Sequence, residues 1–88
     1  RSFELNQKGM RQLTAGLTRL GLSYIPSHGN FVSVKVADAA TVFQRLLKRG
    51  VIVRPIAGYG MPDYLRVSIG LESENERFLE ALRQSIAA

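Results

Sequence analysis

Residues 58–70 constrain the fold of this chain more than any other stretch, because a turn marked by glycine and proline leads directly into a strand pattern. Apolar and polar side chains alternate from residue 64 to residue 69, and neighbouring side chains of a strand point to opposite faces. The apolar set is Leu65, Val67 and Ile69, and the other set is Tyr64, Arg66 and Ser68. One face of this strand therefore suits a core, and the other carries a charge.

The remaining sequence predicts three helices and two more strands. Apolar residues recur at helical spacing in residues 3–21, 39–49 and 72–86, and strand patterns occupy residues 31–36 and 51–55. Residues 25–30 are rich in turn formers and predict a connector. Gly21 is expected to end the first helix and Asp38 to cap the second, while Ser73 and Glu76 have capping-box spacing at the third.

This order of elements predicts an α+β fold, in which a helix precedes a split β-α-β-β-α layer. A right-handed crossover between the first two strands, with the third strand between them, gives a three-stranded mixed sheet of order 1-3-2. We expect the helices mainly on one face. Arg66 would then lie on the central strand and point to the uncovered face.

Composition limits the class of protein. The 88 residues suit one domain, and the absence of cysteine excludes a disulfide framework and a thiolate metal site. His28 is the only histidine, so we expect no metal site.

Twelve Lys and Arg against seven Asp and Glu give a net charge of +5, which makes an acidic partner worth considering. No apolar run reaches the roughly 20 residues that span a bilayer, so we expect no membrane partner. The absence of cysteine fits a reducing compartment, so we expect a cytoplasmic location.

Two arginines are the candidate binding residues. No nucleophile with its base and no carboxylate pair stands out, so we expect no catalytic residue in this chain. Arg54 and Arg66 each lie in a predicted strand among apolar residues, and pairing of those strands would bring them near each other. Guanidinium groups suit bidentate recognition of carboxylate or phosphate. The residues alone are equally consistent with a bound anionic small molecule and with ion pairs to an acid of a neighbouring domain.

Three segments, residues 29–32, 47–70 and 74–82, together resemble the C-terminal small domain of the histidinol-phosphate aminotransferases. These enzymes are a branch of the class I and II aminotransferases of pyridoxal-phosphate fold type I. The resemblance covers nearly the whole chain, and it implies that residues 1–88 form a single domain, the C-terminal small domain of a larger aminotransferase. Residues 1–21 are then expected to be the start of that domain, as a truncated interdomain helix.

The resemblance also implies roles for individual residues. It implies that Arg66 binds the substrate carboxylate or the corresponding group, and that Arg54 helps to hold the substrate phosphate, with the division of labour between them left open. Asn30 and Tyr59 are expected to shape the site. The parent enzyme would convert histidinol phosphate and 2-oxoglutarate to imidazole-acetol phosphate and glutamate in histidine biosynthesis.

The cofactor of such an enzyme is expected outside this chain. The resemblance implies pyridoxal phosphate in the parent enzyme, whereas this fragment lacks the Schiff-base lysine and is expected to bind no cofactor and to be inactive. The expected partners are a small-molecule substrate and the large cofactor-binding domain of the same chain, with no nucleic acid. We expect the parent to be a homodimer and the fragment a monomer.

Two other interpretations stay open. The chain could be the C-terminal domain of a related aminotransferase that acts on aromatic amino acids. It could also be an RNA-binding or regulatory α+β module, for which the net charge of +5 and the split strand-helix-strand layer argue. An RNA-binding sheet needs aromatic side chains that stack on bases, and only Phe31 suits that role.

Overall fold

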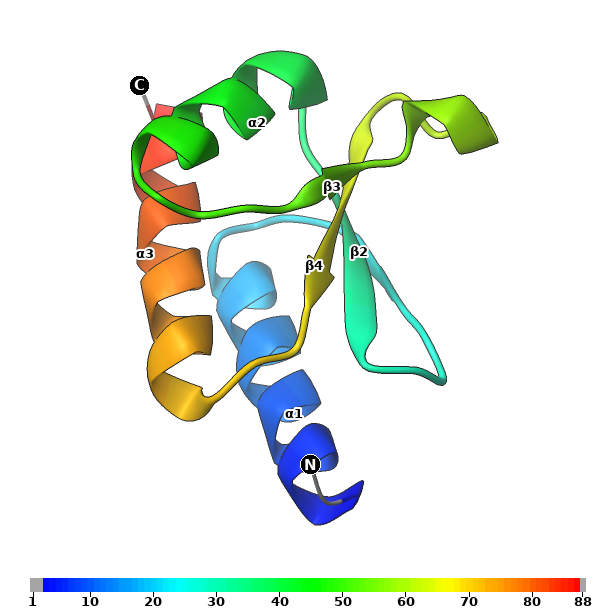
Figure 1. The fold of residues 1–88 in the computed structure, drawn as a ribbon, viewed down its shortest axis with the longest axis vertical. Helices are drawn as coiled ribbons and strands as arrows, with labels where there is room; N and C mark the ends of the chain where they lie inside the picture. The colour runs from blue at the N-terminus through cyan, green and yellow to red at the C-terminus, as the bar shows by residue number, and fades with distance from the viewer. Residues whose placement is uncertain (1–2, 88) are drawn as a thin grey trace.

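The structure is a computed structural model that describes residues 3–87, in which three helices pack against one face of a four-stranded sheet (Figure 1). The helices are α1 (Phe3–Arg19), α2 (Ala39–Lys48) and α3 (Glu72–Ala87), and a short 3₁₀ helix, η1 (Ala57–Tyr59), precedes the last strand. The strands are β1 (Tyr24–Pro26), β2 (Phe31–Lys35), β3 (Arg54–Pro55) and β4 (Tyr64–Ser68). The predicted α+β class and the placement of the helices on one face are confirmed.

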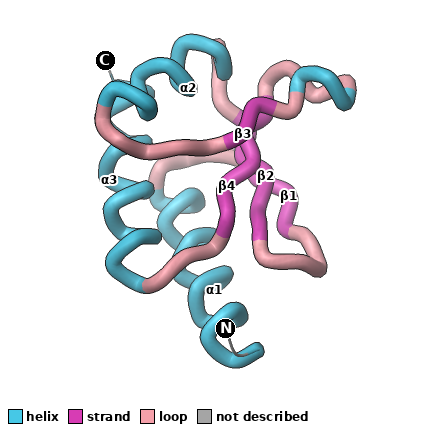
Figure 2. Tube along the Cα trace, viewed as in Figure 1, coloured by secondary structure: helices cyan, strands magenta, loops and turns pink. Residues whose placement is uncertain are grey.

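The sheet differs from the prediction in the number and direction of its strands. Its strand order is β1-β2-β4-β3 (Figure 2). Every neighbouring pair is antiparallel. The predicted three-stranded mixed sheet is therefore wrong, although β4 does lie between β2 and β3. The additional strand, β1, occupies part of the predicted connector at residues 25–30. It is only three residues long, and its terminal Pro26 is tolerated because β1 is an edge strand.

β3 is shorter than the predicted strand at residues 51–55, since only its last two residues pair with β4. The backbone before them follows the end of α2 instead, because the N–H of Val51 donates to the carbonyl of Leu46 at 2.9 Å. Pro55 has no N–H for a ladder, which fits an edge position. Both outer strands of the sheet thus carry a proline, Pro26 in β1 and Pro55 in β3.

The core lies between the helices and the apolar face of the sheet. Leu65, Val67 and Ile69 are each 5% exposed or less, so the predicted alternation of the central strand is confirmed. The helices contribute fully buried leucines to the same cluster, namely Leu13, Leu17, Leu46 and Leu82. Because residues of all three helices share one cluster with the sheet, the central strand is fixed along its whole inner face.

Two of the predicted helix boundaries are confirmed. Gly21 has a φ of 76° and follows α1, and its N–H donates to the carbonyl of Thr18 at 2.9 Å. This left-handed position favours glycine and closes the helix. Asp38 caps α2 as expected, since its carboxylate accepts a hydrogen bond from the N–H of Thr41 at 3.4 Å.

α3 begins at Glu72 as predicted, but its capping contact differs from the prediction. The N–H of Leu71, the residue before the helix, donates to the carboxylate of Glu74 at 2.7 Å, two residues before the position expected for this contact. Glu76 instead accepts a hydrogen bond from Gln12 of α1 at 3.0 Å. The predicted capping box of Ser73 and Glu76 is therefore wrong, because α3 begins at Glu72 and Ser73 already lies within the helix.

The first turns of α3 meet α1 and the end of β4 around one buried amide. Asn75 is 2% exposed, and its Nδ2 donates to Gln12 Oε1 at 2.9 Å and to the carbonyl of Gly70 at 3.1 Å. Gly9 of α1 lies beside this cluster, and a Cβ there would overlap the side chain of Ile69 and lie 3.2 Å from Asn75 Nδ2. The absence of a side chain at Gly9 lets the helix approach the sheet closely.

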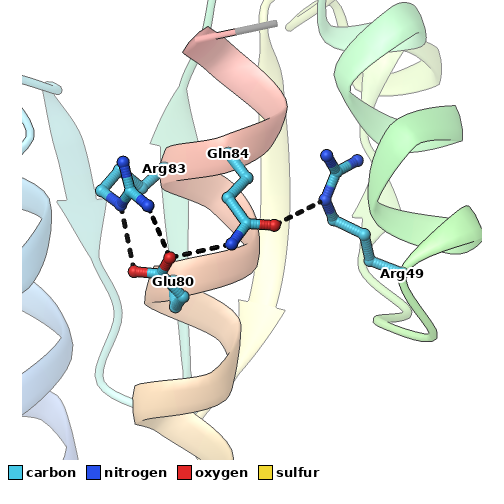
Figure 3. Close-up of polar contacts among 4 residues, drawn as sticks. All are labelled: Arg49, Glu80, Arg83 and Gln84. Atoms are coloured by element: carbon cyan, nitrogen blue, oxygen red, sulfur yellow. Dashed lines mark hydrogen bonds and ion pairs between the residues drawn. The ribbon is translucent and has the colours of Figure 1, made fainter.

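A chain of exposed polar contacts joins the end of α2 to α3 (Figure 3). Arg49 Nε donates to Gln84 Oε1 at 3.1 Å, and Gln84 Nε2 donates to Glu80 Oε2 at 2.9 Å. Arg83 donates to Glu80 through Nε at 3.0 Å and through Nη2 at 2.6 Å. The hydrogen bonds from Arg83, with that from Gln84, lower the pKa of Glu80 from 4.5 to about 2.

Replacing Gly9 by alanine is expected to destabilise the fold. The added methyl group would displace Ile69 and the Asn75 amide, and such overpacking costs about 1–3 kcal/mol, against which a better helix former returns roughly 1 kcal/mol. Urea unfolding should show a net loss of up to about 2 kcal/mol. Gly58→Ala is the matched control, because a Cβ at Gly58 meets nothing within 4 Å. Equal stability of the two variants would contradict the proposed close approach.

Glu80 is expected to titrate far below an ordinary glutamate in a carboxyl-detected NMR titration. Because its pKa falls from 4.5 to about 2 on folding, its contribution to stability is complete above about pH 4.5 and is lost as the pH falls to about 2. The group is fully exposed, so added salt should weaken the effect. Arg83→Gln should raise the midpoint, while Arg11→Gln, on α1, should not. An unchanged midpoint in Arg83→Gln would contradict this assignment.

Candidate functional site

The sheet face away from the helices carries a row of side chains that crosses all four strands. Ile25 of β1 pairs with Ser33 of β2, Ser33 pairs with Arg66 of β4, and Arg66 pairs with Arg54 of β3. Directly paired residues of antiparallel strands point to the same face. We call these four residues the cross-sheet row. The predicted proximity of Arg54 and Arg66 across one ladder is therefore confirmed.

The two arginines of the cross-sheet row are an unusual pair for neighbouring strands. Directly opposed residues have Cβ atoms about 4.5–5.5 Å apart, and like charges in that position are unfavourable. Within residues 3–87, neither guanidinium forms an ion pair or hydrogen bond with a carboxylate. Arg54 is exposed and Arg66 is half-buried. The pair thus presents two positive charges, with their hydrogen-bond donors available, on an uncovered face.

A depression of about 350 Å³ lies beside the arginine pair. Its lining consists of Ile52, Val53, Arg54, Pro55, Arg66 and Ser68. Both arginines therefore border the same open space at the β3 edge of the sheet. A planar anion such as a carboxylate, or a phosphate, is the ligand that such a pair is suited to bind.

Arg66 has one further contact on this face, with an aromatic ring. Its Cζ lies 4.9 Å from the centroid of the Phe31 ring, within the range of a cation–π interaction. Phe31 pairs with Ser68 and is half-buried, so the ring lies diagonally across the β2–β4 ladder from Arg66. Arg54 has no such ring contact within residues 3–87. The two arginines are therefore held differently.

Asn30 and Tyr59 lie near opposite ends of β4 and do not line the depression beside the arginines. The carbonyl of Asn30 accepts a hydrogen bond from the N–H of Ile69 at 2.8 Å, and its side chain is exposed. Tyr59 is 79% exposed and belongs to η1, which projects beyond the ends of β3 and β4 (Figure 1). The structure thus brings the two arginines together but places these two residues outside their immediate surroundings.

Other kinds of site receive little support within residues 3–87. No group of three or more His, Asp or Glu side chains there is arranged to hold a metal ion. His28 lies in the loop between β1 and β2 and lines a separate depression with Arg11 and Met10 of α1. No described helix has the length and apolar character needed to cross a membrane.

The contact between Phe31 and Arg66 is the feature of this face that sequence reasoning missed. The alternation of β2 places Phe31 and Ser33 opposite the buried Val32 and Val34, and this was the available signal. Which residues meet diagonally depends on the pairing register, and the register becomes evident only when β2 lies beside β4.

Comparison of this sequence with known proteins finds a family match and close relatives. Residues 4–82 match the family described as aminotransferase class I and II. The chain is 75% identical over 84 residues to the histidinol-phosphate aminotransferase of Methylobacillus flagellatus, covering 96% of this chain and 23% of that protein. It is 64% identical over 85 residues to histidinol-phosphate aminotransferase 1 of Dechloromonas aromatica, covering 97% of this chain and 24% of that protein.

A solved structure shares the fold. The crystal structure of the histidinol-phosphate aminotransferase from Clostridium acetobutylicum superposes with a TM-score of 0.83 at 22% identity, covering 92% of this chain and 26% of that one. At that identity the likeness is evidence of the fold alone. The chain spans about a quarter of the length of the curated relatives it matches. With the family match extending over most of its residues, this chain belongs to the class I and II aminotransferase family.

Proposed function

We propose that this chain is the C-terminal, substrate-binding domain of a pyridoxal-phosphate-dependent histidinol-phosphate aminotransferase. Two relatives that are named histidinol-phosphate aminotransferases, at 75% and 64% identity, support this proposal, as does the chain's span of about a quarter of their length. The complete enzyme would transfer an amino group from histidinol phosphate to 2-oxoglutarate, giving imidazole-acetol phosphate and glutamate.

The observation that carries the proposal is the direct pairing of Arg54 with Arg66 on the uncovered face. Histidinol phosphate carries a phosphate, and 2-oxoglutarate carries two carboxylates, so both substrates are anions. Two guanidinium groups can bind such groups through charge-assisted hydrogen bonds. A bound anion would also offset the unfavourable interaction between the two like charges.

The different surroundings of the two arginines support a division of labour. Arg66 is half-buried on β4, an inner strand, and this restricts its side chain more than that of Arg54. We assign to Arg66 the substrate carboxylate or the corresponding group near the reacting carbon. Arg54 is exposed on the edge strand and would help to hold the more distant phosphate. Asn30 and Tyr59 would shape the surrounding loops, Asn30 through its backbone bond to Ile69.

The residues of this chain do not fit a cofactor site of their own. Its three lysines, Lys8, Lys35 and Lys48, are all exposed, and none lines the depression beside the arginines. Pyridoxal phosphate, when bound, supplies the electron sink for transamination. In this proposal it is held by a domain outside these residues, and this chain contributes binding and orientation of the substrate.

The experiment that tests the function uses the complete enzyme to which this chain belongs. Purified protein is expected to bind pyridoxal phosphate and to transaminate histidinol phosphate with 2-oxoglutarate. If the purified enzyme did not bind pyridoxal phosphate, the proposal that this chain is part of an active aminotransferase would be wrong. A higher kcat/KM for aromatic amino acids than for histidinol phosphate would instead favour the related branch of the family.

Arg66→Ala in the complete enzyme is expected to lower kcat/KM for both substrates by roughly 10- to 100-fold, because a charge-assisted contact is worth about 1.5–3 kcal/mol. Arg54→Ala should impair histidinol phosphate more than 2-oxoglutarate, since it is assigned to the phosphate. Steady-state kinetics with each substrate varied in turn measures both effects.

Arg19→Ala is the matched control for these variants, because Arg19 is exposed at the end of α1. It should leave both kcat/KM values unchanged. If Arg66→Ala behaved like this control, Arg66 would have no part in the site. If Arg54→Ala impaired 2-oxoglutarate more than histidinol phosphate, the division of labour would be reversed.

A further inference from the structure

We infer that Phe31 is a positioning residue, whose ring holds the Arg66 guanidinium in the orientation that binds the anionic group of the substrate. The inference rests on the function proposed above and adds a residue to that site. Phe31 itself need not touch the substrate. It would act through Arg66, and its effect should appear in substrate affinity.

The geometry places the ring where it can orient the charge. Arg66 Cζ lies 4.9 Å from the ring centroid, and cation–π attraction extends to about 6 Å. Phe31 pairs with Ser68 while Arg66 pairs with Ser33, so the two side chains are diagonal neighbours on one face of adjacent strands. Both are half-buried, which strengthens the attraction relative to a fully hydrated pair.

The ring is itself attached to a well-fixed backbone. The carbonyl of Phe31 accepts a hydrogen bond from the Ser27 hydroxyl at 2.7 Å, and the Ser27 Oγ accepts one from the N–H of Gly29 at 3.1 Å. The preceding carbonyl, of Asn30, accepts from the N–H of Ile69 at 2.8 Å. A side chain with few rotatable bonds on this backbone is a rigid platform.

A ring suits this task better than a carboxylate would. A carboxylate beside Arg66 would occupy its N–H donors and cancel its charge, and both are needed for an incoming anion. An aromatic face attracts the guanidinium and leaves its five donors available at the edges. It also opposes the repulsion from Arg54, which would otherwise displace a flexible arginine side chain. Ordering Arg66 before binding reduces the entropy lost when the substrate arrives.

The simpler explanation is that Phe31 only fills space on the sheet, and the two explanations predict different outcomes. A packing role depends on the shape of the side chain, whereas a cation–π role depends on the electron density of the ring. Fluorination of the ring reduces that density with little change of shape. A packing role also persists when Arg66 is absent, whereas a positioning role does not.

The test uses the complete enzyme with Phe31→Leu, Arg66→Ala and the double variant. Phe31→Leu is expected to raise KM for the substrates by about 3- to 10-fold with little change in kcat, from the strength of a partly desolvated cation–π contact. In the Arg66→Ala background the same change should have no further effect. Phe43→Leu, which removes a ring from α2, is the control that should leave KM unchanged.

A second measurement does not depend on the leucine variant folding. Phenylalanine analogues with one, two and three fluorine atoms are incorporated at position 31, and KM is expected to rise progressively with fluorination while the unfolding temperature stays constant. Equal KM values across this series, or an equal effect of Phe31→Leu with and without Arg66, would overturn the inference. If Arg66→Ala alone changed nothing, the proposed function would fail first, so the two failures are distinguishable.

Discussion

The pairing register of β4 is the constraint on which the uncovered face depends. Side chains alternate along a strand, so a slip of one residue would turn Arg66 toward the helices and expose Leu65 and Val67. Those two residues are 1% and 5% exposed, and burial of each such side chain is worth about 1.5–3 kcal/mol. The core therefore fixes where the arginine points. The helices, which lie on the opposite side of the sheet, thereby determine the geometry of the proposed binding face.

Much of the fold follows from local signals in the sequence, and the differences have identifiable causes. The alternation at residues 64–69 and the left-handed glycine at Gly21 are properties of short segments, and both were predictable. β1 was not, because three residues between turn formers are too few to show a strand period. The capping contact of α3 also escaped prediction, since Glu74 makes it and Glu76 is engaged by Gln12 of a distant helix. A local sequence pattern carries no information about contacts between segments that are distant in the sequence.

The candidate site shows the same division between local and distant information. The neighbouring positions of Arg54 and Arg66 followed from the predicted pairing of their two strands, and the structure has them directly paired. The contact of Phe31 with Arg66 required the register of β2, which lies across a helix and a loop from β4 in sequence. The roles of Asn30 and Tyr59 remain predictions, because both lie outside the depression that the arginines share.

The prolines at the two edges of the sheet have a consequence for how partners reach the arginines. An added fifth strand needs N–H donors along an exposed edge, and neither Pro26 nor Pro55 provides one. Growth of the sheet by β-augmentation, whether by a peptide or by another copy of the chain, is thus disfavoured on both sides. A molecule that covers the arginines is therefore expected to bind through side-chain contacts and not by strand addition, as a substrate or a second domain would. The same feature protects an exposed, cationic sheet from edge-to-edge aggregation.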